Sequence, residues 1–142
     1  MSDTVLLVDD EVEFVDTLAE RMRSRGLQVD TAYNGEEAFI RISEKKYDAI
    51  VLDLAMPGMN GMEVLEKLRD ENPDRQIILL SGQGTVKTAV EASKLGAMDF
   101  LEKPTDIETI IEKIREARAN RMALDSKRSE KEIADILKRR GW

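Results

Sequence analysis

The chain contains no cysteine and no histidine. Without cysteine it can form neither a disulfide framework nor a thiolate metal site. Without histidine it lacks an essential member of serine–histidine triads, the usual zinc ligands and the commonest general base. These two absences exclude several common classes of enzyme before any motif is considered.

Long hydrophobic runs and an excess of positive charge are also missing. No stretch approaches the roughly 20 apolar residues of a membrane span, and residues 1–4 lack the basic region and apolar core of a signal peptide. The net charge of −7 argues against direct nucleic-acid binding. We therefore expect a cytoplasmic protein that contacts neither membranes nor nucleic acids.

The composition that remains is that of one globular domain. Of the 142 residues, 42% are hydrophobic and 36% are charged, which is typical of a folded chain with a substantial core. Five short apolar runs alternate with five helical patterns, and the runs lie at residues 5–8, 27–32, 50–52, 76–80 and 98–101. This alternation predicts an α/β fold with a parallel sheet and helices on both faces.

Capping patterns mark the starts of three predicted helices. Asn34 and Asn60 each precede a glutamate by three residues, and residues 105–108 form a third capping box with Thr105 as its first member. The helix that follows Asn60 should end near Pro73, because the residue before a proline disfavours helical geometry.

The most informative apolar run is 50–52, because it ends directly in Asp53. A single aspartate there could equally be a turn residue, so the other strand ends must decide. In a parallel sheet all carboxyl ends meet at one edge, where ligands bind in open α/β folds. That edge would collect Asp9, Asp10, Asp53, Ser81 and Lys103.

This set of side chains suits phosphoryl chemistry. Three converging carboxylates repel one another and need a hard divalent cation, which we expect to be Mg²⁺. Lys103 adds positive charge, Ser81 a hydroxyl donor, and Asp53 a carboxylate nucleophile that would form an aspartyl phosphate. Each group alone has an ordinary structural explanation, such as a solvated helix start or a turn. Their coincidence at four separate strand ends favours a site.

The chain resembles the receiver domain of two-component response regulators over roughly residues 4–118. The matching segments are Val8-Asp9-Asp10-Glu11, Leu52-Asp53-Leu54-Ala55-Met56-Pro57-Gly58-Met59-Asn60-Gly61, Leu80-Ser81-Gly82 and Asp99-Phe100-Leu101-Glu102-Lys103-Pro104. The resemblance implies a flavodoxin-like (βα)5 fold with strand order 2-1-3-4-5. It also implies a phosphorylated signalling domain rather than an enzyme, with intrinsic self-phosphorylation and autodephosphorylation chemistry.

The resemblance further assigns a role to each site residue. Asp53 would accept phosphate from a histidine kinase or phosphotransfer protein. Mg²⁺ would bind Asp10, Asp53 and the backbone carbonyl of Ala55, with Asp9 acting mainly through a water. Lys103 would contact the phosphoryl oxygens, and its bond to Pro104 is usually cis in the family. Ser81 and Phe100 would form the switch pair.

Two positions depart from common family patterns and should tune the lifetime of the phosphate. Ala55 stands two residues after the acceptor, where a polar side chain is frequent, and Gln83 stands two residues after the switch hydroxyl. The switch aromatic is Phe100, where many relatives have tyrosine. It has no hydroxyl group to satisfy, so burial alone would favour its inward position.

Two rival interpretations remain at this point. A haloacid-dehalogenase-like phosphatase also forms an aspartyl phosphate, but it needs a second acid where this chain has Ala55. A degenerate interaction domain that no longer takes phosphate is disfavoured by the intact acidic pair, Asp53, Ser81 and Lys103.

The last part of the chain differs in charge from the rest. Residues 119–142 carry seven basic and four acidic side chains, a net +3, whereas residues 1–118 carry −10. We therefore expect a receiver domain over 1–118 and a helical extension or linker over 119–142. A homodimer could form through the fourth helix, fifth strand and fifth helix or through the extension, whose apolar positions are too sparse for a strong coiled coil.

Overall fold

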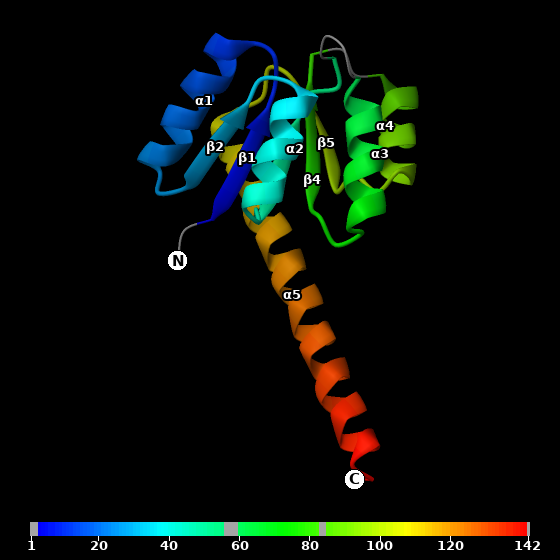
Figure 1. Ribbon diagram of the computed structural model, residues 1–142. Coiled ribbons are helices and arrows are strands. Elements are labelled where there is room, and N and C mark those ends of the chain that lie inside the picture. Colours follow the sequence, from blue (N-terminus) through cyan, green and yellow to red (C-terminus); the bar gives the residue numbers. More distant parts are fainter. Residues whose placement is uncertain (1–2, 56–59, 83–84, 142) are drawn as a thin grey trace.

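Five parallel strands form one sheet in the order β2-β1-β3-β4-β5 in the computed structural model, which describes residues 3–55, 60–82 and 85–141 (Figure 1). The strands are β1 (Thr4–Val8), β2 (Gln28–Ala32), β3 (Ala49–Leu52), β4 (Ile77–Ser81) and β5 (Asp99–Glu102). The helices are α1 (Val12–Ser24), α2 (Gly35–Glu44), α3 (Gly61–Glu71), α4 (Val86–Lys94) and α5 (Ile107–Arg139). The predicted flavodoxin-like fold and its strand order are confirmed.

Alternate residues of the central strands build two separate hydrophobic cores. Val5 and Leu7 of β1 pack with α1 and α5, whereas Leu6 and Val8 pack with α2, α3 and α4. The same alternation holds in β3 and β4, because successive side chains of a strand point to opposite faces. Strands that are buried on both faces explain the continuous apolar runs in the sequence.

The helix caps agree with the sequence patterns at two of the three predicted starts. Asn34 accepts a hydrogen bond from the backbone N–H of Glu37, and Asn60 accepts one from Glu63. At α5 the prediction of a box beginning at Thr105 was wrong by one residue. The cap is Asp106, whose carboxylate accepts from the N–H of Thr109 at 2.8 Å. An aspartate cap satisfies this helix end as well as threonine would.

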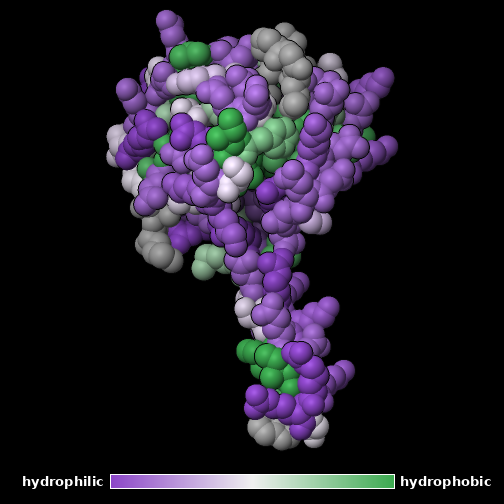
Figure 2. Space-filling view, in the orientation of Figure 1, coloured by the Kyte–Doolittle hydropathy of each residue, from purple (hydrophilic) through white to green (hydrophobic). Residues whose placement is uncertain are grey.

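Helix α5 continues far beyond the sheet as an isolated rod (Figure 1). Its first turns are anchored in the core by Ile110, Ile111, Ile114 and Ala117. Every residue from 125 to 141 is exposed. Figure 2 shows an apolar patch near the far end of the rod, where Ile133, Ile136 and Leu137 are exposed. Within the described residues, no helix combines the length and apolar character that crossing a membrane requires.

Candidate functional site

Three aspartates converge at the carboxyl edge of the sheet, as the strand ends predict. Asp9 and Asp10 follow β1, and Asp53 follows β3. The backbone N–H of Asp53 donates to the carbonyl of Val8 at 2.9 Å. One carboxylate oxygen from each aspartate lies within 4.8 Å of the other two. Asp9 and Asp53 are buried and Asp10 is half-buried, so their charges are poorly screened by water.

Lys103, which follows β5, brings its ammonium into this cluster. Its Nζ lies 2.7 Å from Asp9 Oδ2 and 3.8 Å from Asp53 Oδ2. A contact of 3.4 Å also reaches Glu11, the exposed residue that follows the acidic pair. Among the described residues, Lys103 is the only basic side chain that forms ion pairs within this aspartate cluster, and it pairs with Asp9 and Asp53. The cluster therefore sets three carboxyl groups against one ammonium group.

Burial and ion pairing oppose each other at the Asp9–Lys103 pair. Burial raises the pKa of the Asp9 carboxyl above its ordinary value, and the hydrogen bond from Lys103 offsets only part of this effect. For Lys103, burial alone would lower the pKa of the ammonium, but the hydrogen bond to Asp9 and the charges of Asp9, Asp53 and Glu11 together raise it. Lys103 is therefore charged at neutral pH.

Gly61 approaches the backbone of Asp53 and Leu54 closely. Its N–H donates to the carbonyl of Leu54 at 2.6 Å. A Cβ at position 61 would lie 2.4 Å from the carbonyl oxygen of Asp53, so only glycine fits against this backbone. The backbone N–H of Ala55 reaches Asp53 Oδ1 at 3.4 Å and helps to orient the carboxylate.

Ser81 and Phe100, the predicted switch pair, belong to adjacent strands. Ser81 is the last residue of β4 and is fully buried. In the sheet register Leu79 pairs with Phe100 and Ser81 with Glu102, so Ser81 and Phe100 share one face. Phe100 is half-buried against the core formed with α2, α3 and α4. The Lys103–Pro104 peptide bond, which follows β5, is cis, as the family resemblance implied.

Two residues complete the comparison between the predicted site and the structure, namely Gln83 and Phe14. Gln83 lies outside the described residues. Phe14 of α1, which no sequence motif marks, lies with its ring centroid 4.4 Å from Lys103 Nζ. No periodicity in the sequence could have shown this contact, because Phe14 and Lys103 belong to distant elements.

Comparison with known proteins identifies the family. Residues 5–115 match the response regulator receiver domain. The transcriptional regulatory protein ZraR of Salmonella typhimurium is 35% identical over 82% of this chain and 26% of its own length. A Burkholderia pseudomallei response regulator was solved with a phosphorylated aspartic acid, calcium ion and citrate. It is 30% identical to this chain, the match covers 92% of this chain and 75% of the Burkholderia chain, and the TM-score is 0.75.

A third relative was solved in complex with Mg²⁺-BeF. It is the response regulator TrrA of Thermotoga maritima, 31% identical over 81% of this chain and 98% of that one, with a TM-score of 0.73. The chain thus belongs to the response regulator receiver family, as its sequence resemblance implied. It is a phosphorylated signalling module rather than a classical enzyme. It spans about a quarter of the length of ZraR.

Proposed function

We propose that Asp53 is the phosphoacceptor of this receiver domain, and that a histidine kinase or phosphotransfer protein in the cytoplasm supplies the phosphoryl group. The observation that carries this proposal is the position of Asp53. Its side chain is buried at the end of the central strand, beside two other carboxylates and 3.8 Å from an ammonium. Among the three aspartates it is also the one that follows β3 and whose own backbone packs against Gly61.

The donor set at this edge fits Mg²⁺. Three carboxylates offer oxygen atoms within 4.8 Å of one another, and hard divalent cations prefer oxygen ligands. Asp10 and Asp53 would hold the ion with the backbone carbonyl of Ala55, and Asp9 would act through a water because it already pairs with Lys103 at 2.7 Å. When bound, the ion supplies positive charge that stabilises negative charge on the phosphoryl oxygens.

The transfer is a displacement at phosphorus in which Asp53 is the nucleophile. A carboxylate oxygen of Asp53 bonds to phosphorus as the bond from phosphorus to the donor nitrogen or oxygen breaks. A phosphohistidine donor leaves as imidazole, and acetyl phosphate leaves as acetate. Lys103 is placed to balance charge on the transferred group, since its ammonium already lies beside both Asp9 and Asp53.

Incubation of the full chain with acetyl phosphate and Mg²⁺, followed by intact mass, tests this proposal. A receiver domain should gain one phosphoryl group that is slowly lost. A phosphatase of the haloacid-dehalogenase type would instead release phosphate over many turnovers, and a degenerate domain would do neither. Asp53→Ala should abolish the mass gain. The matched control is Asp125→Ala, which removes an exposed carboxylate of α5 and should leave the mass gain unchanged.

We further propose that phosphorylation draws the Ser81 hydroxyl toward the acceptor and allows Phe100 to move inward. The shared face of these two side chains supports this coupling. The change would be a shift between two packings rather than the creation of a new state. Ser81→Ala should still be phosphorylated at Asp53. Its amide resonances in α4 and β5 should shift less than those of the wild type, and equal shifts would contradict the switch.

The final part of this proposal is that the switch controls self-association. The face formed by α4, β5 and α5 exposes Val86 and Val90, whose exposed fractions are 83% and 47%. The alternative surface is the apolar patch on α5 at Ile133, Ile136 and Leu137. A third alternative, a linker to an output domain, needs neither surface.

Sedimentation of the full chain with and without beryllofluoride distinguishes these alternatives. Val90→Asp should abolish association through α4, whereas Ile133→Glu should abolish association through the extension. A monomer under every condition would leave only the linker.

A further inference from the structure

The ammonium of Lys103 has an aromatic neighbour as well as its carboxylate partners. The ring centroid of Phe14 lies 4.4 Å from Nζ, inside the range of about 6 Å over which a cation is attracted to an aromatic face. The Lys103 side chain is only 13% exposed. A cation with so little contact with water gains more from the ring than an exposed one would.

Phe14 is itself held in place by the core. It projects from the first turns of α1 and packs against the cluster that contains Val15 and Leu18. Its ring also lines a cavity of about 360 Å³ between α1 and α5, to which Lys103 and Pro104 contribute. The core therefore restricts the ring on one side, whereas the four-carbon stem of Lys103 has many rotamers available to it.

A ring differs from a carboxylate in how it holds an ammonium. Asp9 accepts an N–H of Lys103 at 2.7 Å and occupies that donor. An aromatic face attracts the positive charge through its quadrupole and does not require a directed hydrogen bond from an N–H donor. A phosphoryl group on Asp53 would need such donors, and the present Nζ to Asp53 distance of 3.8 Å leaves this contact still to be made.

We propose that Phe14 is a positioning residue that holds the ammonium of Lys103 beside Asp53 and keeps its N–H donors available for the phosphoryl oxygens. This inference rests on the proposed function of Asp53. It adds a residue of α1 to the machinery, and it predicts that an aromatic ring, rather than hydrophobic bulk alone, is required at position 14.

The test compares Phe14→Leu and Phe14→Tyr in the full chain, using Mg²⁺ with beryllofluoride as the phosphoryl mimic. Phe14→Leu should weaken beryllofluoride affinity by about five- to thirtyfold, the range expected for losing a cation–π contact. Phe14→Tyr keeps a ring and should retain wild-type affinity. The affinity for Mg²⁺ alone should be the same in all three proteins, because none of the metal ligands is altered.

The chain offers a matched control in Phe39. This residue is also half-buried and has a lysine, Lys67, 5.9 Å from its ring centroid, but it belongs to α2 and packs into the core on the other face of the sheet. Phe39→Leu should lower stability much as Phe14→Leu does and leave beryllofluoride affinity unchanged. Acetyl phosphate as the donor extends the comparison to phosphorylation rates without any effect of partner docking.

Proton NMR gives a readout that a general structural effect would not reproduce. In the wild type the Phe14 ring should shift the ε-methylene resonance of Lys103 upfield. Phe14→Leu should remove this shift and Phe14→Tyr should keep it.

The outcomes separate the two proposals. Equal beryllofluoride affinity in wild type and Phe14→Leu, or an equal loss in Phe39→Leu, overturns the role of Phe14. Failure of Phe14→Tyr to restore affinity overturns it as well. A wild-type protein that binds no beryllofluoride overturns the proposed function of Asp53, and the inference with it.

Discussion

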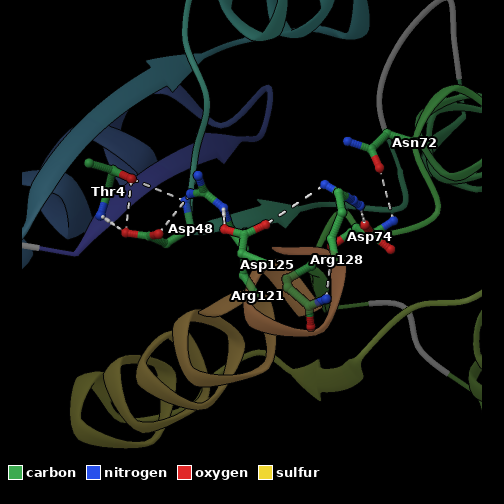
Figure 3. Close-up of polar contacts among 8 residues, drawn as sticks. Thr4, Asp48, Asn72, Asp74, Arg121, Asp125 and Arg128 are labelled. Carbon is green, nitrogen blue, oxygen red and sulfur yellow. Dashed lines mark hydrogen bonds and ion pairs between the residues drawn. The ribbon is translucent and has the colours of Figure 1, made fainter. Parts of the chain in front are cut away.

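Arg121 of α5 donates a hydrogen bond to Asp48 at 2.8 Å, although the two residues lie 73 positions apart in the sequence (Figure 3). Asp48 precedes β3 and also accepts hydrogen bonds from the N–H and hydroxyl of Thr4. Arg128, two turns further along α5, pairs with Asp74 in the loop between α3 and β4. These contacts tie the start of the helical extension to the amino edge of the sheet, opposite the acidic cluster.

Asp48→Ala should therefore destabilise the fold. It removes the acceptor for two groups of Thr4 and for Arg121 at a site where the carboxylate is only 14% exposed. We expect a loss of about 1–3 kcal/mol in the free energy of unfolding, measured with urea. Asp125→Ala is the control. Asp125 is exposed on α5, the helix that carries Arg121, and its substitution should change stability by less than about 0.5 kcal/mol. Equal losses in the two variants would contradict this account.

Hydrogen exchange should divide the extension into two parts. Amides up to Arg128 belong to turns that Arg121 and Arg128 hold against the sheet edge, whereas the turns beyond are exposed on all sides. Isolated helical turns without packing fray readily. Protection should therefore fall sharply after residue 128 in the monomer. Uniform protection to residue 139 would mean that another surface covers the end of the helix.

Gly61→Ala should distort the backbone of Asp53 and Leu54 directly. The new Cβ would lie 2.4 Å from the Asp53 carbonyl oxygen and 2.5 Å from Leu54 Cα, and both neighbours are backbone. We expect a stability loss of about 1–3 kcal/mol in urea denaturation, together with slower phosphorylation by acetyl phosphate. The matched variant is Gly82→Ala, where the nearest atom, a Lys103 Cβ, is 4.0 Å away. A Gly61→Ala protein as stable as Gly82→Ala would refute the close approach.

Tyr47 and Asp30 predict a specific dependence of stability on pH. Tyr47 donates to Asp30 at 2.7 Å. At Asp30, burial would raise the pKa, but the hydrogen bond from Tyr47 and the charge of Lys45 lower it below its ordinary value. For Tyr47, burial and then the hydrogen bond to Asp30 raise the pKa of the phenol. The contact therefore stabilises the fold most between these two titrations.

Tyr47→Phe should cost about 0.5–1.5 kcal/mol at neutral pH. The contribution of Asp30 is present above its unfolded pKa and is lost as the pH falls through its lower folded value. The contribution of Tyr47 is present below about pH 10, the unfolded value, and is lost as the pH rises toward the folded one. The difference between wild type and variant, measured by urea unfolding, should shrink in both directions. A difference that is constant with pH would contradict the assignment.

The elements of the fold were largely predictable because they depend on local patterns. Runs buried on both faces marked β1, β3 and β4, and Asn34 and Asn60 marked helix starts. The acidic cluster followed from topology, since parallel strands bring Asp9, Asp10 and Asp53 to one edge. The contacts of Phe14 with Lys103 and of Arg121 with Asp48 were not predictable. These contacts depend on how α1 and α5 pack in three dimensions, and the spacing of residues in the sequence does not predict that packing.

Mg²⁺ should stabilise the protein through Asp10. The three aspartates repel one another until a cation binds, so the melting temperature should rise with added Mg²⁺. Asp10→Asn should abolish this rise. In chelator it should melt about 2–4 °C above the wild type, since one repelling charge is gone. An Asp10→Asn protein that keeps the full Mg²⁺ effect would show that the ion binds elsewhere.

The most direct test of the central claim is to locate the phosphoryl group on the chain. After reaction with acetyl phosphate and Mg²⁺, borohydride reduction converts an aspartyl phosphate into homoserine, which peptide fragmentation can assign to one position. The account predicts homoserine at position 53 and none at positions 9 or 10. Homoserine at either of those aspartates, or unmodified Asp53 in a protein that has gained a phosphoryl group, would contradict it.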